Sequence, residues 1–581
     1  MAITGHRRGD VRNGDIAALF NEIADMMDIL GEDAFRVLSY RRAARQIEAL
    51  TADLEDLVRE GRLGTIPGVG AALAEKITEH AETGRIRVHE ELRARFPPGV
   101  LGLLRLRGLG PKKVRLLWQE LGITDVDSLK KAAETHRLRR VAGFGEKTEA
   151  NLLRSIELSK EGESRILLAE ADGIARDVIG RLRAAGVVSE IEAGGSLRRM
   201  RETVGDVDIL AVSAQPEAAI RVFTSMPEVH EVVAAGDKKG VVLYRRGARS
   251  VQVDLRVFDL PSWGAALQYN TGSLDHNVRL RTMAERAGLK LNEYGVFRGD
   301  ERIAGATEEE VYAALGLGWI PPEMREDQGE VDLAKEGRLP VLLELRDIRG
   351  DFHVHTNATD GTEPLETMVA AARGLGYAYV GISDHSVSAA VAFGLPAEKA
   401  LERRDRIKGL NRERPEFTVL LGTECDILAD GEMDYPDEVL QEFDFVIASV
   451  HSRFTQERDE MTARVVAAVS NPHVDILGHP TTRKLGERDP VQMDLEDVFS
   501  AAAKAGTAIE IDADPRRMDL DGPKARAAKQ AGCAIAVDTD AHASGELGWM
   551  RFGVGTARRA WLTADDVLNA WPLERVRAFL A

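Results

Sequence analysis

Nine residues in the C-terminal part of the chain have the side-chain types that bind divalent metal ions in proteins. They are His353, His355, Asp360, His385, Glu424, His451, His479, Asp540 and His542. Any one of these histidines alone could be a hydrogen-bonded core or surface residue. Imidazole nitrogens and carboxylate oxygens in this number suit a cluster of ions better than one structural ion. The set therefore predicts a multinuclear metal site, of the kind that generates hydroxide and clamps a phosphoryl group.

The spacing within this set supports the prediction. His353 and His355 are separated by one residue, and so are Asp540 and His542. Because successive side chains alternate between the two faces of a strand, the members of each pair should point the same way.

A second metal signature lies far upstream, in the run Gly-Asp-Val-Asp at 205–208. Asp206 and Asp208 should share one face of a strand, and the alternation of apolar and polar residues in 251–257 places Asp254 on a polar face. Three carboxylates on adjacent strands can hold two Mg²⁺ or Mn²⁺ ions. Such a pair activates an attacking oxygen and stabilises a leaving phosphate.

The residues before this signature strengthen the interpretation. Alone, an Asp-x-Asp run is often a strand end with solvated carboxylates. Here Gly-Gly-Ser-Leu-Arg-Arg at 194–199 adds glycine backbone, a hydroxyl and guanidinium groups, which are good partners for phosphate. Two metal sites on one chain therefore indicate phosphate chemistry.

The elements that must position the downstream residues are strands alternating with helices. From Gly350 onward, apolar runs such as 379–382, 445–448 and 508–511 alternate with alanine-rich helical runs. That alternation favours an α/β domain, and we expect a barrel-like one. The metal motifs follow the apolar runs directly, which would place them at the C-terminal rim of the barrel.

Residues from about 14 to 165 show helical spacing of apolar side chains, as in 16–23. They also contain three similar Gly-x-Gly hairpins between helices, at Gly68 and Gly70, Gly108 and Gly110, and Gly143 and Gly145. Glycine lets the backbone approach a phosphate, and the next helix N-terminus offers free N–H groups. One such loop often merely caps a helix, but three copies favour binding to a duplex backbone.

Length and composition bound the remaining possibilities. A chain of 581 residues exceeds one core, so three or more folding units are expected. The net charge of −18 argues weakly against nucleic acid, but the first 165 residues carry 28 Lys and Arg against 26 Asp and Glu. No apolar run reaches about 18 residues and the N-terminus lacks a signal-peptide core, so we expect a cytoplasmic protein. Cys425 and Cys533 form no C-x-x-C pair and should be buried small hydrophobes.

Several of these segments resemble one known family. GGSLRRMRETVGDVDIL, VQVDLRV and QYNTGSLDHN are similar to the palm and nucleotide-binding regions of family X DNA polymerases, the relatives of DNA polymerase beta. The C-terminal motifs resemble a polymerase-and-histidinol-phosphatase (PHP) domain, in the order found in bacterial and archaeal family X polymerases. The fold implied is multidomain, with all-α helix-hairpin-helix domains, an α+β nucleotidyltransferase palm and a C-terminal α/β distorted barrel.

The resemblance also implies domain boundaries. We expect a lyase-like helical domain with the first hairpin (1–88), a duplex-binding helical domain with the other two (89–165), a palm (166–258), a nascent-base-pair subdomain (259–318), a linker (319–345) and a PHP domain (346–581).

By the same resemblance, Asp206, Asp208 and Asp254 are the catalytic metal ligands. The nucleotide-binding residues implied are Gly195, Ser196, Arg199, Tyr269, Gly272, Asn277 and Arg281. The chain departs from the family's Tyr-Phe-Thr-Gly-Ser pattern at Asn270, which removes an aromatic ring beside the sugar. We therefore expect weaker rejection of ribonucleotides.

Other basic residues have roles implied less directly. Lys76 occupies the place of the lysine that forms a Schiff base with an abasic-site sugar, but another basic position of that pattern is Ala72 here. A phosphate-binding or solvated Lys76 is the alternative. Arg453 and Arg483 lie near ligand histidines and could grip a substrate phosphate, or be solvated.

The function implied is gap-filling DNA synthesis in repair, with a Mn²⁺-dependent 3′–5′ exonuclease and an abasic-site endonuclease or 3′-phosphatase activity. Mg²⁺ or Mn²⁺ would occupy the upstream site, and up to three Mn²⁺ or Zn²⁺ ions the downstream site. The expected partners are gapped or primer-template DNA and dNTPs, with the chain a monomer. The alternatives are a small-molecule phosphoesterase, a non-catalytic scaffold for DNA ends, and a PHP nuclease whose polymerase is weak or lost.

Overall fold

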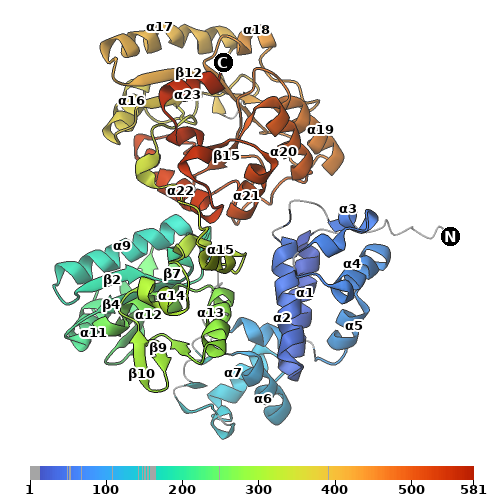
Figure 1. The fold of residues 1–581 in the computed structure, drawn as a ribbon, viewed down its shortest axis with the longest axis vertical. Coiled ribbons are helices and arrows are strands. Elements are labelled where there is room, and N and C mark those ends of the chain that lie inside the picture. Colours follow the sequence, from blue (N-terminus) through green and yellow to red (C-terminus); the bar gives the residue numbers. More distant parts are fainter. Residues whose placement is uncertain are drawn as a thin grey trace. The chain divides into compact units, whose positions relative to one another are not determined.

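The computed structural model describes residues 13–581, except for 49, 51–53, 67, 98, 107–108, 142, 147, 150–151, 154–155, 157–164, 248 and 390–391. The chain divides into two compact units, Met1–Ser164 and Arg165–Ala581 (Figure 1). Among the described residues, no helix is both long enough and apolar enough to cross a bilayer.

The N-terminal unit is helical, as the apolar spacing predicted. Its α-helices are α1 (Asn13–Leu30), α2 (Ala34–Glu48), α3 (Leu54–Arg59), α4 (Ala71–Thr83), α5 (Arg87–Arg93), α6 (Pro111–Leu121) and α7 (Val126–Glu134). Ile16, Phe20 and Ile23 of α1 are fully buried. They belong to one hydrophobic cluster that extends as far as Ile156. Helix α5 runs across residues 88 and 89, where we expected one helical domain to end and the next to begin.

The three glycine hairpins share one backbone geometry. Each follows a short 3₁₀ helix, namely η1 (Leu63–Thr65), η2 (Val100–Arg105) and η3 (Leu138–Arg140). In each, an amide donates to the carbonyl three residues earlier at 3.0–3.1 Å: Val69 to Ile66, Leu109 to Leu106 and Phe144 to Val141. Gly68 and Gly143 have φ of +82° and +85°, a region that favours glycine, and Gly108 lies outside the described residues. The internal repeat read from the sequence is therefore a structural repeat.

The C-terminal unit begins with a five-stranded mixed sheet. Its strands are β2 (Glu190–Ala193), β4 (Val207–Val212), β5 (Val229–Ala235), β6 (Lys239–Arg246) and β7 (Arg249–Phe258), in the order β2-β4-β7-β6-β5. Helices α9 (Leu168–Ala184) and α11 (Pro216–Thr224) pack against it. β4 and β7 are parallel neighbours, and their register sets Asp208 opposite Asp254. The α+β palm predicted for this region is thus present.

A smaller helical segment with a three-stranded sheet follows. It contains α12 (Trp263–Thr271), α13 (Leu274–Arg286), β8 (Lys290–Asn292), β9 (Gly295–Arg298), β10 (Glu301–Ala304) and α14 (Glu308–Ala314). Residues 319–345, which we expected to be a linker, fold onto this segment and include α15 (Glu330–Glu336). The physical reason is that Ile320 and Val331 are buried in the same core as Tyr312, while buried Arg325 is paired with Glu308 at 2.6 Å.

The rest of the chain forms a parallel sheet surrounded by helices. Its strands are β11 (Tyr379–Ile382), β12 (Thr418–Asp426), β13 (Phe445–Ser449), β14 (Ile476–Leu477), β15 (Ala508–Asp512) and β16 (Ile535–Asp538), in chain order. The stretch 351–355 joins the two edges: Gly381 donates to the carbonyl of Asp351 at 2.8 Å, and Val354 pairs in parallel with Ala541. The sheet therefore curls round onto itself, and the predicted α/β barrel is confirmed.

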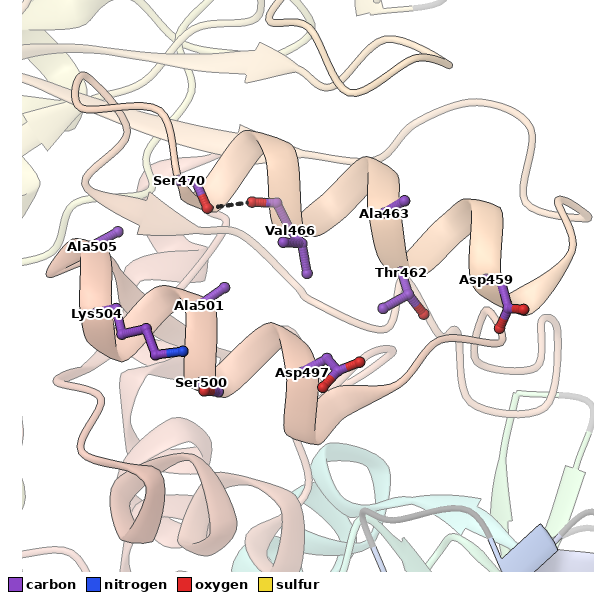
Figure 2. Close-up of a pocket in the computed structure, with 10 residues that line it drawn as sticks. All are labelled: Asp459, Thr462, Ala463, Val466, Ser470, Asp497, Ser500, Ala501, Lys504 and Ala505. Carbon is purple, nitrogen blue, oxygen red and sulfur yellow. Dashed lines mark hydrogen bonds between the residues drawn. The ribbon is translucent and has the colours of Figure 1, made fainter. Parts of the chain in front are cut away.

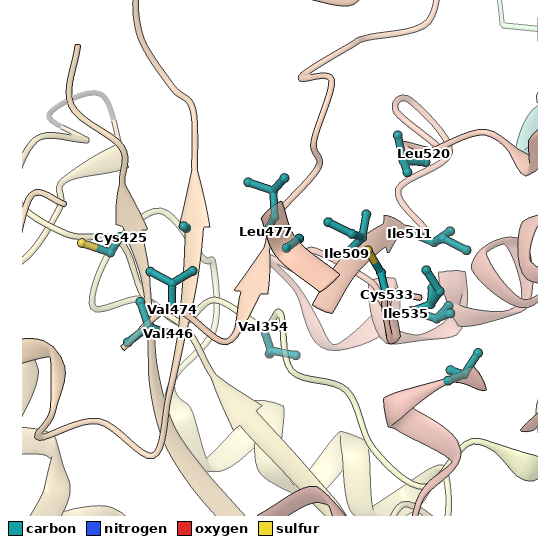
Figure 3. Packing of buried hydrophobic residues seen from close by; sticks show 14 of the residues in the cluster. Val354, Cys425, Val446, Val474, Leu477, Ile509, Ile511, Leu520, Cys533 and Ile535 are labelled. Atoms are coloured by element: carbon teal, nitrogen blue, oxygen red, sulfur yellow. The ribbon is translucent and has the colours of Figure 1, made fainter. Parts of the chain in front are cut away.

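The helices of this barrel follow the strands in the expected alternation. They are α16 (Leu365–Gly374), α17 (Ala397–Glu413), α18 (Asp437–Leu440), α19 (Arg458–Val469), α20 (Leu495–Ala505), α21 (Gly522–Ala531), α22 (Met550–Arg559) and α23 (Leu573–Phe579). Apolar side chains from several strands pack together in the core (Figure 3). Cys425 and Cys533 are buried, unpaired members of this core, as their isolation in the sequence indicated.

Candidate metal centres

All nine downstream residues converge at the carboxyl ends of the barrel strands. Three groups of side chains bring ligand atoms within 4.8 Å of one another: His355, Asp360, His385 and His542; His353, His355 and Asp540; and His385, Glu424 and His451. His479 joins through Glu424, whose Oε1 lies 2.9 Å from His479 Nε2. The barrel brings them together because parallel strands end at one rim, although the residues span almost 200 positions of sequence.

The polar atoms of this cluster fit metal ions. Within the described residues, buried atoms with no hydrogen-bond partner include His353 Nε2, both ring nitrogens of His355, His385 Nδ1 and Glu424 Oε2. Buried polar atoms are normally hydrogen-bonded, so several unpartnered ligand-type atoms that face one space fit the binding of a cation. Mixed imidazole and carboxylate ligands suit Mn²⁺ or Zn²⁺.

The pKa shifts differ from one histidine of the cluster to another. Burial, together with the imidazoles of His542 and His385, lowers the pKa of His355 to about 3, which keeps the ring neutral. Although burial opposes it, the surrounding His385, His451 and His353 hold the pKa of the Glu424 carboxyl well below its usual range. Although burial opposes it, nearby carboxylates raise the pKa of His385 to about 10 and that of His542 to about 9. A metal ion that bound here would displace protons from these rings.

Sequence reasoning missed a second layer of carboxylates that orient the histidines. Glu510 Oε1 lies 2.6 Å from His353 Nδ1, and Asp426 Oδ1 lies 2.7 Å from His451 Nδ1. Such partners set the tautomer and the ring orientation of ligating histidines. The strand pattern held a signal: Glu510 and Asp426 are acidic residues within the apolar runs that became β15 and β12.

The arginines near this cluster differ in their environment. Arg453 is exposed, whereas the Arg483 guanidinium donates to the carbonyls of Arg517 and Met518 and so braces that loop. Arg517, which sequence reasoning missed, is only 12% exposed and approaches Asp540 at 3.6 Å and Asp512 at 3.4 Å. Arg517 Nη1 has no hydrogen-bond partner in the described part of the chain. Arg517 is therefore a buried cation beside Asp540 and Asp512.

The upstream carboxylates also gather, but less tightly. Among described residues, the groups of three or more metal-type side chains within 4.8 Å all belong to the downstream cluster. Burial and the nearby carboxylates of Asp206 and Asp254 nevertheless raise the pKa of Asp208 to about 7. Lys239 Nζ lies 3.2 Å from Asp254 Oδ2 and partly compensates this charge. Mutual repulsion of buried carboxylates is what a divalent cation relieves, so these residues fit such ions.

The glycine-rich segment before β4 lies directly against these carboxylates. It forms the short helix α10 (Gly195–Arg198). A Cβ atom at Gly195 would lie 2.7 Å from Asp208 Oδ2, and Gly195 has φ of +59°. Only glycine lets the backbone approach so closely in this conformation. Ser196, one residue on, is half-buried.

The other predicted nucleotide contacts are Arg199, which directly follows α10, and residues on or between α12 and α13. Arg199 donates through Nη1 to the carbonyl of Thr271, and a Cβ at Gly272 would lie 2.9 Å from that nitrogen. Buried Asn277 donates to the carbonyl of Tyr269 at 2.7 Å. Arg281 lies one turn further along α13 and is half-buried. The structure thus brings the predicted nucleotide-binding residues to one region of the C-terminal unit.

The predicted DNA contacts of the N-terminal unit lie at hairpin turns. Gly70, Gly110 and Gly145 each accept a hydrogen bond of 3.0 Å from the amide four residues on, so each begins a helical turn. Lys76 in α4 is half-buried, and its Nζ donates to the carbonyl of Ala72 at 2.9 Å.

A surface pocket of about 780 Å³ lies elsewhere, between α19 and α20 (Figure 2). Its lining is mostly small, with Asp459 and Asp497 at one end and Lys504 at the other. None of its lining residues belongs to the sites described above.

Carboxylates on a mixed sheet, a histidine-rich cluster on a parallel barrel and repeated hairpins define a class: multidomain, metal-dependent enzymes of phosphate chemistry on nucleic acid. Family models agree, matching the DNA polymerase beta thumb at 266–326, a PHP domain at 351–514, a helix-hairpin-helix domain at 11–86 and a SAM-like helix-hairpin-helix tandem at 100–157.

Curated relatives identify the family. The chain is 36% identical over 568 residues to the DNA polymerase/3′-5′ exonuclease PolX of Bacillus subtilis (strain 168), covering 97% of this chain and 99% of that protein. It is 33% identical over 162 residues to a probable phosphatase of Thermoanaerobacter sp. (strain X514), covering 26% of this chain and 63% of that protein. It is 24% identical over 345 residues to DNA polymerase lambda of Arabidopsis thaliana, covering 54% and 62%. The chain belongs to the family X DNA polymerases that carry a PHP domain.

Proposed function

We propose that this protein fills short gaps in DNA during repair as a DNA-directed DNA polymerase, and trims 3′ ends as a 3′–5′ exonuclease. The observation that carries the proposal is two separate metal-type sites in one chain that aligns from end to end with a relative named for both activities. The helix-hairpin-helix and thumb matches support DNA as the substrate.

In the polymerase site, Asp206, Asp208 and Asp254 would hold Mg²⁺ or Mn²⁺. Bound ions would supply activation of the primer 3′ oxygen and stabilisation of the leaving pyrophosphate. The Ser196 hydroxyl and Arg199 guanidinium would bind the triphosphate. Tyr269 and Gly272 would line the sugar, Asn277 and Arg281 would contact the nascent base pair, and Gly195 would let the backbone approach the phosphates.

In the exonuclease site, the nine histidine and carboxylate residues would hold up to three Mn²⁺ or Zn²⁺ ions. Those ions would supply a hydroxide nucleophile and a clamp on the phosphoryl group. Glu510 and Asp426 would keep His353 and His451 in the ligating tautomer. Arg517 would balance the negative charge of the phosphate next to Asp540. Arg453 is free to reach the DNA strand, whereas Arg483 would act mainly by holding the Arg517 loop.

Two further activities belong to the same site. Cleavage at an abasic site and removal of a 3′-phosphate need the same hydroxide and phosphoryl clamp. A relative named as a probable phosphatase aligns with 26% of this chain, and its name makes 3′-phosphate removal a reaction to test on DNA ends.

The test uses a 5′-labelled primer on a one-nucleotide-gapped duplex with Mn²⁺, with and without dNTPs. We expect extension when dNTPs are present and shortening when they are absent. Asp208→Ala should abolish extension and leave shortening, and His355→Ala should do the reverse. The two variants serve as controls for each other, because each alters one site of the same folded chain.

Other outcomes would change the proposal. Shortening without extension in the wild type would mean that the upstream site does not polymerise and that the chain works mainly as a nuclease. DNA binding without any turnover in Mg²⁺ or Mn²⁺ would instead indicate a scaffold for DNA ends.

A further inference from the structure

Helix α22 of the C-terminal barrel packs tightly against the palm. Phe552 of α22 is buried in the palm's hydrophobic cluster, and a Cβ atom at Gly555 would lie 2.5 Å from Met200 Cε. Met200 directly follows the segment with Ser196 and Arg199. The barrel therefore abuts the part of the palm that we assign to the triphosphate.

Arg559, the last residue of α22, reaches into this segment. Its side chain is only 4% exposed. Its Nη1 atom donates to the backbone carbonyl of Arg199 at 3.0 Å and to Glu326 Oε1 at 3.1 Å. The same Glu326 oxygen accepts from Arg199 Nε at 3.1 Å. One oxygen of Glu326 thus contacts both Arg559 of the barrel and Arg199, the arginine predicted to bind the triphosphate.

The guanidinium of Arg199 is strongly constrained by these contacts. Nε is held by Glu326, and Nη1 is held by the carbonyl of Thr271. The carbonyl of Arg199 comes at the end of α10, where helix carbonyls lack an intrahelical partner. Arg559 supplies that partner. It also shares the negative charge of Glu326 with Arg199 and with Arg201, whose Nη1 lies 3.9 Å from the same oxygen.

We propose that Arg559 of the PHP barrel is a positioning residue for nucleotide binding at the polymerase site, acting through Glu326 and the Arg199 carbonyl. This inference rests on the proposed polymerase function. The barrel is then a structural part of the polymerase site as well as the carrier of the nuclease.

Loss of the Arg559 charge affects Arg199 in two ways, and both weaken triphosphate binding. The end of α10 loses its donor, so the segment that meets the triphosphate loosens. Glu326, only 17% exposed, loses one cation and binds Arg199 more strongly, which withdraws that guanidinium from phosphate. A hydrogen bond to a charged group contributes enough that Arg559→Gln should raise the KM for dNTP about tenfold, with a smaller change in kcat.

The matched control is Arg551→Gln. Arg551 lies on the same helix and also crosses to the palm, where it pairs with Asp172 at 2.9 Å. The hydrogen bonds of Arg551 go to Asp172 and to the carbonyl of Gly548, and not to Glu326. If α22 only docks the two domains, both variants should behave alike.

The experiment measures primer extension on the gapped duplex with Mg²⁺, and also binding of labelled dTTP with Ca²⁺ by equilibrium dialysis. We expect weaker dTTP binding and a raised KM in Arg559→Gln, near-normal values in Arg551→Gln and in 3′–5′ exonuclease rate, and partial rescue in Arg559→Lys. In a Glu326→Gln background, Arg559→Gln should have a smaller effect, because coupled residues are non-additive.

Each alternative result decides the matter. Unchanged dTTP binding in Arg559→Gln, with weakened binding in Arg199→Gln, would overturn this inference and leave the proposed function standing. An equal loss in Arg551→Gln would also overturn it. If Arg559→Gln does not fold, Arg559→Lys takes its place and is measured both alone and together with Glu326→Gln. Normal dTTP binding by Arg559→Lys in both cases would show no coupling between the two positions and would overturn the inference. A wild type that neither binds dTTP nor extends primers would overturn both.

Discussion

The Glu510→Gln substitution tests the carboxylate layer behind the barrel cluster. Glu510 uses both oxygens: Oε1 lies 2.6 Å from His353 Nδ1, and Oε2 accepts from the amide of His479. The side-chain amide of the variant has only one acceptor oxygen, so it can keep either the contact with the His353 ring or the contact with the His479 amide, but not both. If its NH₂ faces the ring, the His353 proton moves from Nδ1 to Nε2, and Nε2 is the nitrogen directed toward Glu424 at 3.3 Å. The variant therefore blocks a ligand atom without removing the ligand.

The magnitude follows from this geometry. Removal of a carboxylate behind a ligating histidine typically lowers metal affinity by about 10–100-fold, or roughly 1.4–2.8 kcal/mol. Because Glu510 serves two ligand histidines, we expect the upper part of that range. Exonuclease activity at limiting Mn²⁺ should fall by a similar factor and should recover as Mn²⁺ is raised.

The assay is a Mn²⁺ titration of primer shortening, together with metal content by mass spectrometry after dialysis. Asp475→Asn is the matched control, since Asp475 is also an acid of the barrel sheet but precedes β14, at the end away from the metal-type cluster, where it accepts from the amide of Val446 at 2.8 Å. Primer extension checks that the palm remains intact. A Glu510→Gln protein with the wild-type Mn²⁺ dependence and full metal content would refute the reasoning.

Three further predictions concern the other sites. Gly195→Ala should reduce primer extension by about tenfold or more, because its Cβ would lie 2.7 Å from an Asp208 oxygen at a φ of +59°; Gly180→Ala, in α9 with open space around it, should extend normally, and equal rates would contradict this. Asn270 turns its amide back to a carbonyl of its own helix at 2.8 Å, so we expect a low ratio of kcat/KM for a dNTP over its rNTP and a higher ratio in Asn270→Phe; a strongly selective wild type would argue against it. Borohydride trapping on abasic-site DNA should give a covalent adduct that Lys76→Ala lacks if Lys76 forms the Schiff base, and an adduct that survives this change would assign the reaction elsewhere.

Much of the fold could be predicted because its signals are local. The strand-like run at 379–382 became β11 with those bounds, since short apolar runs of this kind are buried in sheets. The hairpin repeat was readable because the glycine positions reflect a backbone need within a few residues. The 319–345 stretch misled the prediction because its charges suggested exposure, while Arg325 is buried through pairing with Glu308, more than a dozen positions earlier.

For the site, residue type and spacing found the metal-type side chains but not their support. Glu510, Asp426 and Arg517 were missed because an isolated acid or arginine in a sequence does not reveal what it faces. For Arg483 the sequence left open a phosphate contact or a solvated side chain, and in the structure its donors are engaged with the loop that holds Arg517.

The sequence by itself determined the chemistry available: three palm carboxylates, nine barrel residues of metal-binding type and glycines where only glycine fits. Those features depend on side-chain identity and on backbone geometry within a few residues, so they are written locally. Only the tertiary structure decided that His353 meets Glu510. It also decided that Arg559 contacts Glu326, 233 positions away, and Arg199, 360 positions away. Such contacts arise from the packing of whole domains, where burial and pairing of charge depend on which surfaces meet, and no local pattern encodes that.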